Sequence, residues 1–83
     1  MAIRVRVLYF GQAREAAGKK EEDFSLPRAS SVKTLVRLAV NTHSGLRGIQ
    51  GAMRVAVNEE IAAHGDRLDD GDVVALLPAV AGG

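Results

Sequence analysis

The final three residues of the sequence, Ala81-Gly82-Gly83, are the part of the chain best suited to carry chemistry. Glycine has no Cβ, so Gly82 and Gly83 could thread a slot too narrow for any other residue. The group that would react is the α-carboxylate of Gly83, which would serve as a chemical handle after activation. These residues alone leave a second interpretation open, a frayed tail, because chain ends tolerate glycine and are commonly disordered.

Side chains elsewhere offer few alternative sites. The sequence has no cysteine, which excludes disulfides, thiolate metal sites and cysteine nucleophiles. His43 and His64 are fewer than the three or four ligands that zinc usually takes. The four aspartates between positions 66 and 72 lack the downstream glutamate of a calcium loop, so we interpret them as an acidic turn. We therefore predict no metal site and no bound cofactor, and we favour a carrier or binding module.

Composition narrows the class of protein further. Eighty-three residues predict one domain, and 47% hydrophobic content predicts a globular one. A net charge of +1 and only three aromatic residues argue against nucleic acid as a partner. No apolar run approaches the roughly 20 residues of a membrane span, and no signal peptide is visible. We therefore expect a cytoplasmic protein that does not insert into membranes.

The first part of the chain predicts two strands around a short helix. Residues 3–10 alternate so that Ile3, Val5, Val7 and Tyr9 share one face. Residues 12–17 predict a short helix closed by Gly18. Residues 19–22 are predicted to form a charged turn before a second strand at 23–26.

The rest of the chain predicts one main helix and three further strands. The helix should begin at a serine cap, Ser30 or Ser31, and end between Asn41 and His43. Strands are predicted at 53–58, at 61–63 as a short edge strand, and at 73–77. The run 73–77 is apolar throughout, which predicts a strand covered on both faces. Residues 46–52 give no clear prediction.

This order of elements predicts an α+β fold. We expect a β-grasp, or ubiquitin-like, roll with a mixed sheet of four or five strands and one main helix. The predicted domain covers residues 1–78, and residues 79–83 form a flexible diglycine tail. The last strand would lie inside the sheet, so that the tail projects from the domain as an arm.

Several segments together resemble a known family. The first is the N-terminal strand. The others come after it: Phe10-Gly11-Gln12-Ala13-Arg14-Glu15 with Gly18, Val55-Ala56-Val57-Asn58, Leu68-Asp69-Asp70-Gly71-Asp72-Val73-Val74-Ala75-Leu76-Leu77-Pro78, and Gly82-Gly83. Their order and spacing resemble the MoaD-like sulfur carriers, the small subunits of molybdopterin synthase, within the MoaD/ThiS group of ubiquitin-like proteins. The resemblance covers essentially the whole chain.

The resemblance implies a carrier rather than an enzyme. An E1-like adenylyltransferase would use ATP to adenylate the Gly83 carboxylate, and a sulfur donor would convert the adenylate to a thiocarboxylate. The arm would then enter the large subunit of molybdopterin synthase, in a heterotetramer, and its sulfur would attack the pyranopterin precursor. Catalytic side chains would belong to the large subunit.

The resemblance also implies docking residues. They are Arg14, for the activating enzyme, and Leu76, Leu77, Pro78, Val80 and Ala81 near the reactive pair Gly82 and Gly83. Core packing is the alternative for Leu76 and Leu77, and should hold for at least one of them. The family often has a second proline before the tail and a serine or threonine before the diglycine. Here the segment Pro78-Ala79-Val80-Ala81 departs from that pattern.

Three alternative functions stay open from the sequence. One is a sulfur carrier for thiamine synthesis or tRNA thiolation, although thiazole carriers usually lack the helix at residues 10–15. Another is a ubiquitin-like protein modifier that forms isopeptide bonds with lysines. The last is a β-grasp interaction domain whose glycine tail is incidental.

Overall fold

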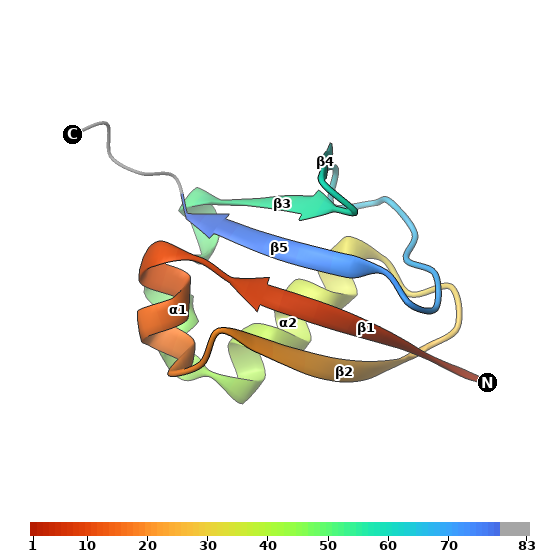
Figure 1. The fold of residues 1–83 in the computed structure, drawn as a ribbon, viewed down its shortest axis with the longest axis horizontal. Helices are drawn as coiled ribbons and strands as arrows, with labels where there is room; N and C mark the ends of the chain where they lie inside the picture. Colours follow the sequence, from red (N-terminus) through yellow and green to blue (C-terminus); the bar gives the residue numbers. More distant parts are fainter. Residues whose placement is uncertain (79–83) are drawn as a thin grey trace.

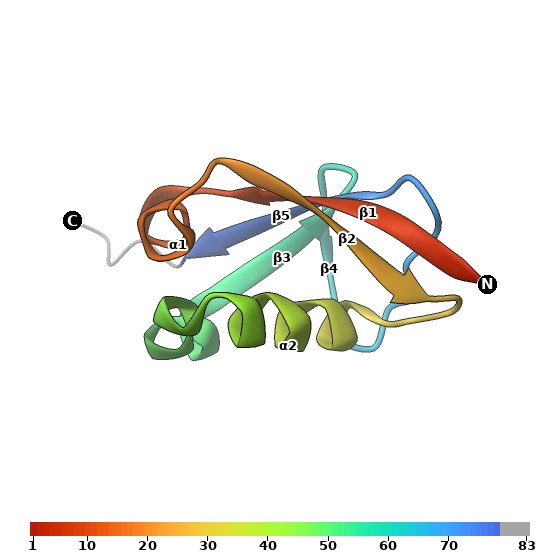
Figure 2. The same ribbon diagram turned by 90° about the horizontal axis from the view of Figure 1, so that it is seen from below.

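The computed structural model describes residues 1–78, and within them five strands form one mixed sheet in the order β2-β1-β5-β3-β4 (Figure 1). The helix α2 lies across one face of this sheet (Figure 2). The elements are β1 Ala2–Tyr9, α1 Gly11–Ala17, β2 Glu21–Pro27, α2 Val32–Thr42, the 3-10 helices η1 Ser44–Gly48 and η2 Gln50–Ala52, β3 Met53–Val57, β4 Glu60–Ala62 and β5 Val73–Pro78. This arrangement confirms the predicted α+β roll.

The first two strands and the helix between them follow the sequence prediction closely. Ile3, Val5, Val7 and Tyr9 are all buried, and β1 pairs antiparallel with β2. Gly18 caps α1 with φ 75°, a left-handed conformation that favours glycine. The predicted charged turn at 19–22 is wrong in its second half. Glu21 and Glu22 belong to β2, because the ladder with β1 continues as far as the pair Leu8–Glu21.

The main helix also begins and ends where its capping signals predict. The Ser31 hydroxyl accepts a hydrogen bond from the Thr34 amide at 3.3 Å, so Ser31 rather than Ser30 is the cap. The predicted apolar residues Val32, Leu35, Val36 and Ala39 face the sheet and are buried. After α2, the segment that gave no clear prediction forms η1 and η2, and Leu46 of η1 is fully buried.

The β3–β4 hairpin turns through two residues with positive φ. Asn58 has φ 51° and Glu59 has φ 71°, the conformation of a type I′ turn. The Asn58 side chain also donates to Asp72 at 3.0 Å and accepts from the Val73 amide at 3.0 Å. The turn is thereby tied to the start of β5. The predicted edge strand exists, at residues 60–62 rather than 61–63.

Strand β5 lies at the centre of the sheet, parallel to β1 and antiparallel to β3. The prediction that both of its faces are covered is wrong. Val74 and Leu76 are buried against the helical layer, whereas Val73 is 37% exposed and Ala75 and Leu77 are only half-buried. The reason is that α2 covers one face of the sheet, and no element of residues 1–78 forms a layer on the other (Figure 2).

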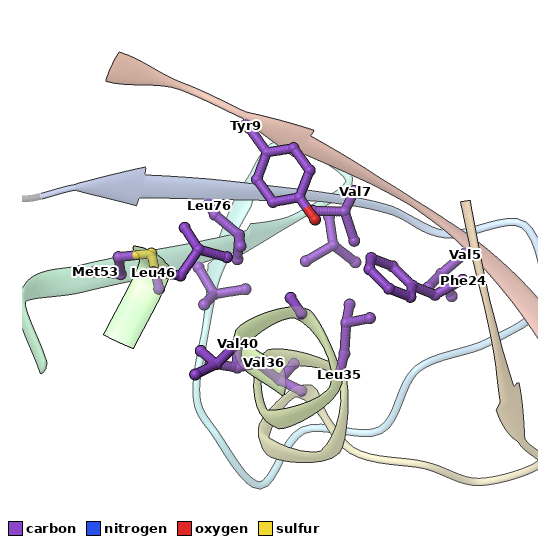
Figure 3. Close-up of a cluster of buried hydrophobic side chains, with 14 of the residues drawn as sticks. Val5, Val7, Tyr9, Phe24, Leu35, Val36, Val40, Leu46, Met53 and Leu76 are labelled. Atoms are coloured by element: carbon purple, nitrogen blue, oxygen red, sulfur yellow. The ribbon is translucent and has the colours of Figure 1, made fainter. Parts of the chain in front are cut away.

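One hydrophobic core fills the space between the sheet and α2 (Figure 3). Val5 and Val7 of β1, Phe24 of β2 and Leu76 of β5 meet Leu35 of α2 there. Leu68 is 1% exposed, which confirms that it points inward from its loop. Within residues 1–78, no helix is long and apolar enough to cross a membrane.

Candidate docking surface

The terminal residues follow in sequence from Pro78, at the centre of the sheet's end. Pro78 pairs with Met53 at the start of β3, and Leu76 pairs with Tyr9 at the end of β1. A Cβ on Gly11 would lie 3.9 Å from Cγ of Pro78, so α1 begins beside this proline. We call this part of the molecule, made of Pro78, α1 and the start of β3, the arm end (Figure 1).

The structure separates the sequence-predicted docking residues into three groups. Leu76 is 0% exposed, so it is a core residue and its assignment to a docking patch is corrected. This satisfies the expectation that at least one of the two leucines packs in the core. Leu77 and Pro78 are half-buried at the arm end, and Arg14 is exposed on α1. Val80, Ala81, Gly82 and Gly83 lie outside the described residues.

An apolar strip runs along the uncovered face of the sheet toward Pro78. We define the outer strip as Leu8 of β1 with Val73, Ala75 and Leu77 of β5. Leu8 pairs with Ala75, and all four side chains alternate away from the core residues of their strands. Apart from Leu77, the strip was missed from the sequence. The signal was the unbroken apolar run of β5, which we interpreted as burial on two faces.

Charged side chains surround a hollow beside α1. It measures about 720 Å³ and is lined by Gly11, Gln12, Arg14, Glu15, Gly18, Lys19 and Lys20. Three of these residues are cations and one is a carboxylate, so the hollow favours an acidic surface on a partner. Arg14 lies on α1, whose first residue, Gly11, is beside Pro78, so Arg14 and Pro78 lie at the same end of the molecule.

A hydrogen-bonded cluster joins the residues on either side of α1, and sequence reasoning did not find it. Glu22 Oε1 accepts from the Tyr9 hydroxyl at 2.8 Å and lies 2.7 Å from His43 Nε2. Lys19 Nζ donates to Glu22 Oε2 at 3.3 Å. Burial raises the pKa of Glu22, but hydrogen bonds from His43, Tyr9 and Lys19 outweigh it and hold this pKa below its ordinary value. Burial, with the Glu22 carboxylate, raises the pKa of Tyr9.

The remaining polar clusters build turns. Asp70 accepts from the Arg4 amide, Asp66 from the Ala63 amide and Asp72 from the Asp69 amide, all within 2.9 Å. The interpretation of this segment as an acidic turn is confirmed, with Gly71 at φ 88°. No group of three or more histidine, cysteine, aspartate or glutamate side chains among residues 1–78 is placed to hold a metal ion.

Curated relatives match the chain over almost their whole length. The molybdopterin synthase sulfur carrier subunit of Mycobacterium tuberculosis is 39% identical over 82 residues, covering 98% of this chain and 99% of the relative. The protein of the same name from Caenorhabditis briggsae is 34% identical over 83 residues, with 98% and 99% covered.

Solved structures share the fold. SAMP1 from Haloferax volcanii superposes with a TM-score of 0.86 at 26% identity, covering 96% of this chain and 99% of that chain. A chain of the complex of subunits 1 and 2 of molybdopterin-converting factor from Helicobacter pylori gives a TM-score of 0.69 at 29% identity, with 98% and 100% covered. The model of the ThiS family matches residues 7–83. This chain belongs to the ThiS family.

Proposed function

We propose that this chain is the sulfur carrier subunit of a cytoplasmic molybdopterin synthase. The observation that carries the proposal is the near full-length match to relatives of that name, at 39% and 34% identity. The arm end supports it, because the terminal segment follows a central strand that carries most of the outer strip, and Arg14 lies on the helix α1 that begins beside Pro78.

The carboxylate of Gly83 is a poor electrophile and requires activation. In the proposed reaction it attacks the α-phosphate of ATP on an E1-like adenylyltransferase, and pyrophosphate leaves. A sulfur donor then supplies the equivalent of hydrosulfide to the acyl carbon. The new C–S bond forms as the bond to AMP breaks, which leaves a thiocarboxylate on Gly83. This chain holds no cofactor of its own in this scheme, and it supplies the reacting terminus rather than a catalytic side chain.

The loaded arm then serves the large subunit of the synthase. Ala81 and Gly82 pass through a narrow channel with little desolvation cost, since their side chains are small and uncharged. The thiocarboxylate sulfur attacks a carbon of the pyranopterin precursor to form a thioester. Water then cleaves the acyl C–S bond, which leaves the sulfur on the pterin and returns the Gly83 carboxylate. Two such transfers build a dithiolene. A heterotetramer with two carriers supplies both sulfurs.

The described surface around the arm provides the docking contacts. Leu77 and Pro78, together with the outer strip, offer an apolar patch of the kind that marks protein interfaces. Arg14 offers a bidentate donor to a carboxylate of the activating enzyme. Val80 and Ala81 extend the apolar contact into the partner.

A second candidate function is a protein modifier. SAMP1 from Haloferax volcanii, whose name denotes a small archaeal modifier protein, shares the fold with a TM-score of 0.86. The same acyl-adenylate would then react with a lysine amine rather than with a sulfur donor. Recovery of this chain on lysines of other proteins, with Gly83 in an isopeptide bond, would favour this second function.

Deletion of Gly83 tests the carrier function. We expect the variant to lose sulfur transfer to the pyranopterin precursor in an assay with the activating enzyme, the sulfur donor and the large subunit. Its melting temperature should equal that of the unaltered chain, since the core is built from residues up to Leu76. Adding one alanine after Gly83 should have the same effect, because the carboxyl group is then held in an amide. Full transfer by either variant would contradict the proposal.

A further inference from the structure

The Glu22 carboxylate gathers donors from three separate segments of the chain. Oε1 lies 2.8 Å from the Tyr9 hydroxyl, at the end of β1, and 2.7 Å from Nε2 of His43, which follows α2. Oε2 accepts from Lys19 in the loop before β2. The side chains of Glu22 and His43 are only 17% and 16% exposed. The proposed sulfur transfer assigns no role to this cluster.

A carboxylate with so little exposure is stable only if its oxygens are hydrogen-bonded. Charge-assisted hydrogen bonds are shorter and stronger than neutral ones and have a stricter geometry. The rings of Tyr9 and His43 also meet edge to face, with centroids 5.8 Å apart and planes at 88°. The cluster therefore fixes the relative positions of the segments that supply its donors.

Both ends of the connection that carries α1 are held at Glu22. The connection leaves β1 at Tyr9 and returns through Lys19, and both of these side chains donate to the same carboxylate. The Tyr9 amide also donates to the Lys20 carbonyl at 2.8 Å. α1 has only seven residues, and a helix this short is unstable without tertiary contacts.

His43 also binds the start of η1, the segment against which α1 packs. Its carbonyl accepts from the Leu46 amide at 3.0 Å, which starts η1. A Cβ on Gly45 of η1 would lie 3.2 Å from the Ala16 carbonyl oxygen, so η1 and α1 pack closely. Glu22 thus holds α1 in two ways. It binds Tyr9 and Lys19 on either side of α1, and through His43 it binds the start of η1, which packs against α1.

We propose that Glu22 is a positioning residue that places α1, and with it Arg14, beside Pro78 at the arm end for docking to the activating enzyme. The expected effect on the reaction with the activating enzyme rests on the proposed function. α1 carries Arg14 on its exposed surface, and its first residue, Gly11, lies beside Pro78. A shift of α1 would move Arg14 away from Pro78, and a partner must contact both residues together.

The placement of α1 is tested first by NMR, without any partner. Glu22→Ala removes all three acceptor contacts, and Tyr9→Phe removes one. We expect the amide shifts of residues 11–17 and 44–48 to change in Glu22→Ala, and by a smaller amount in Tyr9→Phe. Amides of the β3–β4 hairpin should stay in place. Glu21→Ala is the matched control, because it removes the same charge from the exposed neighbour. Unchanged α1 shifts in a folded Glu22→Ala protein would overturn the inference.

The consequence for docking is tested by pyrophosphate exchange with the activating enzyme, well below the melting temperature of each variant. We expect Glu22→Ala to raise KM for the carrier about tenfold with kcat unchanged. Tyr9→Phe should give a smaller rise, and Glu21→Ala none. A KM equal to that of the unaltered chain in folded Glu22→Ala would overturn the inference. No exchange with the unaltered chain would instead count against the proposed function, and the NMR result would still decide the placement of α1.

Discussion

Two neighbouring leucines at the end of β5 have opposite environments. Leu76 is fully buried in the core, whereas Leu77 is half-buried on the outer strip at the arm end. The alternation follows from the strand geometry, which points successive side chains to opposite faces of the sheet. Sequence alone does not separate them, because both belong to one apolar run.

Alanine at each position should therefore have a different effect. Leu76→Ala should lower the free energy of unfolding by about 2–5 kcal/mol, because it leaves a cavity in the core. Leu77→Ala should keep most of the stability and should instead weaken binding to the large subunit. Chemical denaturation and a titration with the large subunit measure the two effects. Equal losses of stability would show that the two environments are assigned incorrectly.

The lowered pKa of Glu22 links folding to pH. The carboxylate is more acidic in the folded chain than in the unfolded chain, so it stabilises the fold above the ordinary glutamate pKa of about 4.3. That contribution disappears as the pH falls through the lower, folded value. We expect the difference in unfolding free energy between the unaltered chain and Glu22→Gln to be largest near neutral pH and to shrink below about pH 4. The control Glu21→Gln should show no such trend, and a difference that grows on acidification would contradict this account.

At the scale of elements, the β3–β4 hairpin contains a correctable strain. Glu59 has φ 71°, a conformation that costs residues with a side chain roughly 1–2 kcal/mol. Glu59→Gly removes this cost, while glycine loses about 0.5–1 kcal/mol through chain entropy. We expect a net gain of between about 0 and 1.5 kcal/mol in unfolding free energy, measured by denaturant titration.

The adjacent strand residue provides the matched control for this hairpin. Glu60 lies in β4 rather than in the turn, so Glu60→Gly should destabilise the chain. If Glu59→Gly were as harmful as Glu60→Gly, the turn would not have the left-handed conformation described.

Local signals predicted most elements correctly, for physical reasons that particular residues illustrate. The alternation of β1, the Ser31 cap and Gly18 are short-range features, so the sequence contains them fully. The uncovered face of β5 depends instead on how many layers pack on the sheet. The Glu22 cluster depends on three segments that meet only in the folded chain. Neither is visible in a local pattern.

At the scale of the whole molecule, the fold concentrates the predicted docking residues at one end. Leu77, Pro78 and Arg14 come from positions far apart in sequence, and the central place of β5 brings them together at the arm end. The acidic turn of residues 66–72 precedes β5 and lies at the opposite end of this strand from Pro78 (Figure 1). Gly82 and Gly83 of the tail lie outside the described residues, and their reactive role stays a prediction.

Whether this chain carries sulfur is decided by its intact mass after incubation with ATP, its activating enzyme and a sulfur source. We predict the mass gain that corresponds to exchange of one oxygen for one sulfur, localised to Gly83 by fragmentation. An unchanged mass, with an activating enzyme shown to be active on another carrier, would contradict the account of this chain as a sulfur carrier.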